Sequence, residues 1–100
     1  MNLKTPIPIK MHPCRKRIVE RLLEIEEDAT FADGYDDAII GLGMVHTRKP
    51  VVVYDRQKCI ETLVKRDGMS YDEAEEFFCF NTDCAWVGEQ TPMFLDRCEE

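Results

Sequence analysis

The fold is decided by residues 50–81, whose sequence is PVVVYDRQKCIETLVKRDGMSYDEAEEFFCFN. The β-branched run that follows the proline, residues 51–54, is typical of an interior strand covered on both faces. Asp55 comes next, and its short carboxylate can accept from the free N–H groups of a helix that begins at Arg56. We therefore expect a buried strand that leads directly into a helix.

The helix that begins at Arg56 carries a clear apolar stripe and a clear end signal. Lys65 and Arg66 lie near its C-terminal end, where the helix dipole favours cations. Gly68 supplies the left-handed residue that ends the helix. The stripe consists of Cys59, Ile60, Leu63 and Val64.

A second helix follows after a short loop. Ser70 and Glu73 form a capping box, which predicts a helix that begins at Tyr71 and ends at Asn81. We expect four of its side chains to point inward, namely Tyr71, Ala74, Phe77 and Phe78.

An earlier amphipathic helix is predicted for residues 13–28, with Pro13 in its first turn. Its apolar positions are Ile18, Leu22, Ile25 and Ala29, flanked by Val19 and Leu23. The charges oppose the helix dipole, because cations crowd the first turn and acids the last. Pairs such as Lys16 with Glu20 and Arg21 with Glu24 are expected to offset part of that cost. The simplest interpretation is a solvated helix face.

The remaining segments complete an α+β fold. Residues 38–45 are apolar throughout and predict a second buried strand, which forms an antiparallel hairpin with residues 51–54. Residues 33–34 and 88–92 read as turns, and residues 86–88 as a short third strand or an extended packing segment. The fold class is therefore α+β, a short antiparallel β-hairpin or sheet packed against about three helices, in a single domain of residues 1–100.

Length and composition restrict the class of protein. The chain has 100 residues and a net charge of −7, which disfavours direct nucleic-acid binding because affinity for phosphates comes from neutralising them. No apolar run approaches the ~20 residues of a membrane helix. The odd number of cysteines, five, fits reduced thiols. We expect a cytoplasmic protein, in the host cell, that does not bind membranes.

Enzymatic and metal chemistry find little support in the sequence. The only serine is Ser70, which the helix cap explains, and Cys14 near His12 is the only close Cys–His pair. Zinc ligands could be drawn from Cys79, Cys84 and Cys98 with that pair, but no tight second cysteine pair exists. The carboxylates of residues 28–37 lack the order of a calcium loop and read as a solvated turn. We expect no catalytic residues, no metal and no cofactor.

One segment of the acidic chain is strongly basic. Cations at a helix N-terminus can bind a small anion or phosphate group, and nearby aromatic rings can stack on a base. The same cations could instead pair with Glu20, Glu24 or the carboxylates of a neighbouring subunit. The candidate ligand-binding residues are Lys10, His12, Arg15, Lys16, Arg17, Tyr35, Tyr54 and Trp86.

Several motifs together resemble a widespread family of small phage and prophage proteins. The motifs are GYDDAIIG (residues 34–41), VYD (53–55), YDEA (71–74), FN (80–81) and AWVGEQTP (85–92). The resemblance spans roughly residues 34–95 and is specific as a set. It carries over no catalytic residues and implies a viral or prophage origin. Such relatives more often have glycine at the position of Cys84, which weakens a zinc site there.

These observations give three hypotheses. The first is a non-catalytic phage- or prophage-encoded binding protein that acts on a host factor, with counter-defence as one such role. The second is a binder of a nucleotide or another small phosphate-bearing molecule. The third is an acidic DNA mimic that presents Glu20, Glu24, Glu27, Asp72 and Glu76 in spaced rows. A homodimer through residues 93–95 is also expected, since symmetric dimers are the commonest soluble assembly.

Overall fold

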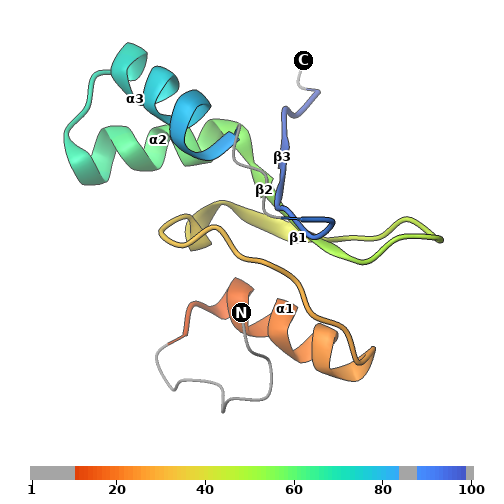
Figure 1. Ribbon diagram of the computed structural model, residues 1–100. Helices are drawn as coiled ribbons and strands as arrows, with labels where there is room; N and C mark the ends of the chain where they lie inside the picture. Colours follow the sequence, from red (N-terminus) through yellow and green to blue (C-terminus); the bar gives the residue numbers. More distant parts are fainter. Residues whose placement is uncertain (1–10, 84–87, 99–100) are drawn as a thin grey trace.

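The computed structural model describes residues 11–83 and 88–98, and they form an α+β fold (Figure 1). Three α-helices and a three-stranded mixed sheet make up this part of the chain. The predicted fold class is confirmed. In chain order the elements are α1 (Pro13–Glu24), the 3-10 turn η1 (Asp36–Ala38), β1 (Ile39–Gly43), β2 (Val51–Asp55), α2 (Arg56–Asp67), α3 (Tyr71–Phe78), the π-helical turn η2 (Cys79–Asp83) and β3 (Met93–Leu95).

The sheet has the strand order β1-β2-β3, so β2 is the interior strand, as predicted. β1 and β2 form the expected antiparallel hairpin. β3 runs parallel to β2, with Phe94 opposite Tyr54. The chain passes through α2 and α3 between these two strands, and such a crossover brings a strand back in the parallel direction. A short third strand or an extended packing segment was predicted at residues 86–88. Residues 86–87 lie outside the described residues, and the observed strand comes later, where the sequence indicated only an apolar contact.

The prediction of a fully buried second strand is wrong in its extent and its burial. β1 ends at Gly43, and a register shift between Ile39 and Gly41 places Ile40 in an exposed position. Met44 and Val45 continue into the hairpin loop and are exposed. A continuous apolar run predicts burial on both faces, but the side chains of this sheet are fully buried on one face alone.

The first helix is shorter than predicted, because α1 ends at Glu24 and not at Asp28. The chain leaves the helix through Glu26, whose φ of 55° is left-handed, and the N–H of Glu27 donates to Leu22 O at 3.0 Å. The acids that follow Glu24 would each oppose the negative end of a longer helix dipole. Ala29 is buried as predicted, but it lies in the loop after the helix.

The predicted start, end and apolar stripe of the second helix are observed. The carboxylate of Asp55 accepts from the backbone N–H of Lys58 at 3.2 Å, and α2 begins at Arg56. Gly68 ends the helix in the left-handed conformation with φ 69°. Cys59, Ile60 and Leu63 of the predicted stripe are fully buried.

The third helix begins as predicted, but half of its predicted inward side chains are exposed. Both hydrogen bonds of the capping box are present, at 3.1 Å and 3.2 Å. Ala74 and Phe78 are fully buried, whereas Phe77 is 41% exposed and Tyr71 45% exposed. Only about one third of the circumference of a helix this short faces the core, and Ala74 and Phe78 occupy that third. The chain continues into η2 through the predicted end at Asn81.

The core lies between the helices and one face of the sheet. Its largest fully buried side chains are Tyr54, Phe78, Leu22, Ile60 and Leu63. Phe78 makes edge-to-face contacts with Tyr35 and Phe94, with ring centroids 5.8 Å and 4.9 Å apart. None of the helices in the described part of the chain is both long enough and apolar enough to cross a membrane.

Candidate functional site

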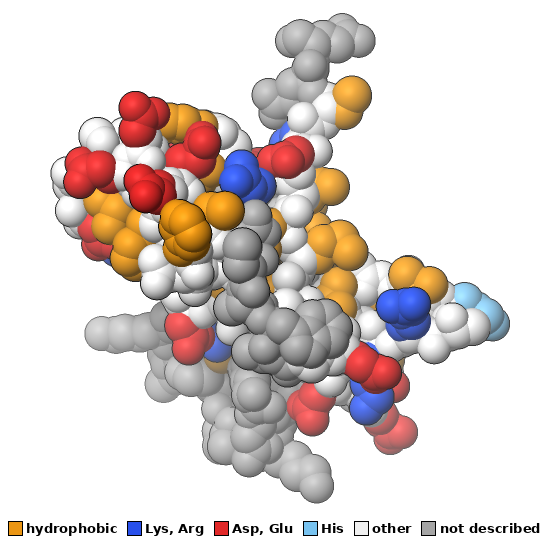
Figure 2. Space-filling model, turned by 45° about the horizontal axis from the view of Figure 1, so that its top comes forward, with side chains coloured by type: hydrophobic (Ala, Val, Ile, Leu, Met, Phe, Trp, Pro, Cys, Tyr) orange, Lys and Arg blue, Asp and Glu red, His pale blue; other side chains and the backbone are white. Residues whose placement is uncertain are grey.

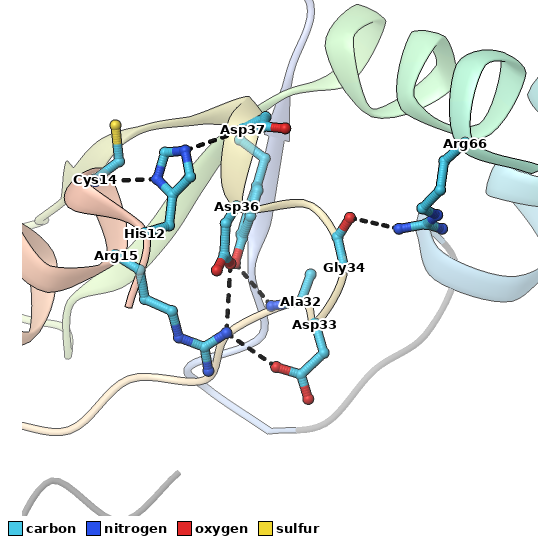
Figure 3. Close-up of polar contacts among 10 residues, drawn as sticks. His12, Cys14, Arg15, Ala32, Asp33, Gly34, Asp36, Asp37 and Arg66 are labelled. Atoms are coloured by element: carbon cyan, nitrogen blue, oxygen red, sulfur yellow. Dashed lines mark hydrogen bonds and ion pairs between the residues drawn. The ribbon is translucent and has the colours of Figure 1, made fainter. Parts of the chain in front are cut away.

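The polar side chains at the start of α1 face the loop that precedes β1 (Figure 3). His12 caps α1, because its Nδ1 accepts from the backbone N–H of Cys14 at 3.1 Å. Its Nε2 lies 2.8 Å from Asp37 Oδ1. With Nδ1 acting as the acceptor, the proton of the neutral imidazole is on Nε2 and is donated to Asp37. His12 therefore joins the helix to the loop.

Arg15 makes the second connection between α1 and this loop. Its Nη1 lies 3.1 Å from Asp33 Oδ1 and 3.3 Å from Asp36 Oδ1. Its guanidinium also lies over the ring of Phe31, 4.4 Å from the centroid. Asp33 and Asp37 remain solvated, as predicted, with side chains 87% and 83% exposed, whereas Asp36 is 26% exposed. Asp33 and Asp36 also compensate the cation at the positive end of the α1 dipole.

The structure separates the predicted ligand-binding residues into groups with different surroundings. His12 and Arg15 are held by the loop carboxylates, whereas Lys16 and Arg17 are exposed on α1. Of the predicted acidic partners, Glu24 pairs with Arg21 at 3.1 Å, as expected. Lys10 and Trp86 lie outside the described residues.

The two predicted stacking tyrosines are core residues and present no ring to a ligand. Tyr54 is fully buried, and its hydroxyl oxygen accepts from the backbone N–H of Ala32 at 2.8 Å. Burial raises the pKa of Tyr54 to about 12. Tyr35 is buried against Phe78, and the Arg66 guanidinium lies 5.8 Å from its ring centroid. Both aromatic assignments are therefore corrected.

The cysteines show no arrangement typical of a reactive or metal-bound thiol in the described part of the chain. The sulfur of Cys14 points away from the His12 ring, which contacts the backbone N–H instead (Figure 3). Among the residues that the structure describes, no group of three or more His, Cys, Asp or Glu residues is placed to hold a metal ion. Cys84, one of the predicted zinc candidates, lies outside those residues.

A groove of about 530 Å³ lies beside the same loop, between it and α2. Arg66 Nη1 donates to Gly34 O at 2.8 Å and links the two walls. No signal in the sequence indicated this groove. Lys58 and Lys65 could be placed on one face of α2 by their spacing, but the loop that faces them is brought there only by tertiary contacts. The charged residues of its lining are Asp37, Lys58, Glu61, Lys65 and Arg66.

The sheet has a second exposed feature, which we call the open sheet face. Val52, Tyr54 and Phe94 point toward the helices, so the alternation of strand residues turns Val53 and Met93 to the other side. Met93 is 50% exposed and its neighbour on that side, Leu95, 42% exposed. Hydrophobic side chains gather over this part of the molecule in Figure 2, while acidic side chains gather over α3. The open sheet face consists of Gly41, Gly43, Val51, Val53, Met93 and Leu95.

Gly41 and Gly43 leave the β1 edge of the open sheet face without side chains. No heavy atom lies within 4 Å of a Cβ built on Gly41, whereas a Cβ on Gly43 would meet Val53 Cγ2 at 2.9 Å. The side chain of Val53 therefore leans over a strand that carries none on this side. A partner can approach the backbone of β1 closely there.

The acids named for a DNA-mimicking surface do not form one row. Glu20 and Glu24 are on α1, whereas Asp72 and Glu76 are on α3. The two helices lie on different sides of the molecule in Figure 1.

Comparisons of the chain with models of protein families, with curated proteins and with solved structures found no match.

Proposed function

We propose that this protein is a non-catalytic binding protein, encoded by a phage or prophage, that acts on a host protein through its open sheet face. The observation that carries the proposal is the exposure of Met93 and Leu95 beside the half-buried Val51 and Val53. Contiguous apolar patches on a monomer mark contact sites, because removing apolar surface from water lowers the free energy of the system. The phage resemblance of the sequence supports the choice of a host partner.

The charge near this face specifies the chemistry of the partner. α3 carries Asp72, Glu73, Glu75 and Glu76 and has no lysine or arginine. In Figure 2 acidic and hydrophobic side chains both lie over α3, and a further group of hydrophobic side chains lies beside them. Electrostatic complementarity favours a partner whose apolar contact surface is bordered by Lys or Arg side chains. Interference with such a host protein is the role we assign, and counter-defence is one form of it.

The test introduces negative charge on the apolar face and includes a matched control. Met93→Glu with Leu95→Glu places two carboxylates on the open sheet face. Leu23→Glu changes a side chain of similar exposure, 46%, on α1. Both variants should keep the wild-type circular dichroism. The wild-type protein is used to capture partners from host lysate, and each captured protein is then purified and titrated against all three forms.

We expect a captured host protein whose affinity falls at least about tenfold for the sheet-face variant and is unchanged for Leu23→Glu, with weaker binding at high salt. Equal affinity for all three forms would contradict the assignment of the surface. The proposal also fails if the sheet-face variant changes nothing except the molecular mass in solution, because the face would then join two copies of this chain.

A further inference from the structure

We propose that the groove between α2 and the loop of residues 33–37 binds a small phosphorylated molecule that also carries sugar hydroxyls. This inference is independent of the host-protein contact, which lies on the open sheet face. It differs from the basic segment of α1, which the sequence indicated. The volume of about 530 Å³ is within the range of roughly 300–1,000 Å³ that small-molecule sites occupy.

The loop wall of the groove is fixed before any ligand arrives. Gly34 has φ 95°, a conformation that favours glycine, and a Cβ there would lie 2.9 Å from Arg66 Nη1, so a larger residue would strain the backbone and shift the guanidinium. Arg66 holds Gly34 O at 2.8 Å and is itself held by both carboxylate oxygens of Asp67 at 3.1 Å. On the other side of the loop, His12 holds Asp37. A preorganised wall lowers the entropy cost of binding.

The helix wall supplies the cations. Lys58 and Lys65 are seven residues apart in α2, which places them about two turns, or ~10 Å, apart along the same face. Their ammonium groups can reach a phosphate from both ends of the groove. Lysine binds phosphate as a mobile point charge, so this spacing accommodates one or two phosphate groups. With Arg66, the lining carries three cations in a chain of net charge −7.

The acids of the lining decide what else the ligand carries. Asp37 is 83% exposed in its side chain and uses Oδ1 for His12, and Glu61 is exposed between the two lysines. Carboxylates repel a bare anion but accept hydrogen bonds from sugar hydroxyls, as they do in dinucleotide sites. Among the residues that the structure describes, the lining has no aromatic side chain that could stack on a base. Phosphate and sugar are shared by nucleotides and sugar phosphates.

The experiment is calorimetric titration of the full-length protein with four probes: inorganic phosphate, ribose 5-phosphate, AMP and ADP. We expect binding of the sugar-bearing probes, with affinity reduced about tenfold or more by Lys58→Ala and by Lys65→Ala. Glu61→Gln should weaken ribose 5-phosphate but leave inorganic phosphate unchanged or tighter. Ribose 5-phosphate and AMP bound equally would assign a sugar-phosphate site, and tighter binding of AMP a nucleotide site. Tighter binding of ADP than of AMP would place a second phosphate on the lysines.

Lys16→Ala with Arg17→Ala is the control, because these side chains are exposed on α1 outside the groove. Its affinities should equal those of the wild type. If this double variant loses binding while Lys58→Ala and Lys65→Ala retain it, the ligand is on α1 and the inference is overturned. It is equally overturned if no probe binds at millimolar concentration, and neither result affects the contact on the open sheet face.

Discussion

The two faces of the sheet are built from alternating residues of the same strands, yet they have different surroundings. Val52 and Tyr54 are fully buried toward the helices, whereas Val51 and Val53 are half-buried on the open sheet face. All four belong to a single apolar run. A single apolar run can therefore have one face in the core and the other half-buried, so the burial of each side chain cannot be inferred from the run as a whole.

The largest stability effect is expected on the helix side. Phe78→Ala removes a fully buried ring that contacts Tyr35 and Phe94, so we expect a loss of about 3–5 kcal/mol in the free energy of unfolding. Phe77→Ala, one position earlier and 41% exposed, is the matched control and should cost about 1 kcal/mol or less. Urea unfolding of both variants measures the difference. Equal losses would show that α3 does not pack as described.

The next largest loss of stability is expected when the hydroxyl of Tyr54, on the core face of the sheet, is removed. Tyr54→Phe leaves the N–H of Ala32 without its acceptor, and we expect a loss of about 1–2 kcal/mol at neutral pH. The experiment compares urea unfolding of the variant and the wild type. A stability equal to that of the wild type would mean that water replaces the hydroxyl at Ala32.

The same side chain predicts a dependence on alkaline pH. The pKa of Tyr54 is about 12 in the folded protein and 10.0 for the free group, so the unfolded chain loses this proton first. The folded state then binds more protons, and the free energy of unfolding falls as pH rises from about 10 to about 12. Tyr54→Phe should lose this part of the slope. The difference between the pH profiles of the variant and the wild type separates the contribution of Tyr54 from that of the lysines. Parallel profiles would contradict a buried phenol.

A smaller loss of stability is expected from Arg15, which joins α1 to the loop of residues 33–37. Arg15→Ala removes the contacts to Asp33, Asp36 and the ring of Phe31 and should cost about 1 kcal/mol, less at high salt. Arg17→Ala, two positions later and exposed, should be within about 0.5 kcal/mol of the wild type. Thermal unfolding at two salt concentrations distinguishes them. The anchoring role would be rejected if Arg17→Ala cost as much.

The smallest stability effect is expected on the open sheet face. Met93→Ser changes a half-exposed side chain, and we expect a change within about 0.5 kcal/mol in the free energy of unfolding. Its effect on partner binding should be far larger, which is the signature of a contact surface. A loss above about 2 kcal/mol in urea unfolding would instead place Met93 in the folding core.

Some features could be predicted because their signals are local. The Asp55 cap, the left-handed Gly68 and the capping box of Ser70 and Glu73 each act within four residues, and all are observed. The choice between Phe77 and Phe78 could not be made, because both lie next to the apolar stripe of α3. The rings of Tyr35 and Phe94, which are distant in sequence, select Phe78 by packing against it.

The candidate sites depended still more on long-range contacts. The sequence indicated an unusual basic segment at the start of α1, but the carboxylates that hold His12 and Arg15 lie 18 to 25 residues away along the chain. The groove beside Lys58 and Lys65 requires Gly34, and the bond that joins its walls spans 32 residues. Spacing within one helix carries no information on which loop will face it.

The sequence by itself determined where α2 and α3 begin, where α2 ends and which strands form the hairpin, because helix caps, glycine conformations and hairpin pairing depend on near neighbours. The tertiary structure decided that β3 joins the sheet in the parallel direction, that Tyr54 is a core residue, and that the loop of residues 33–37 lies against both α1 and α2. These outcomes depend on which surfaces meet after the chain has turned back on itself. Such meetings are set by the packing of the whole core and by no single motif.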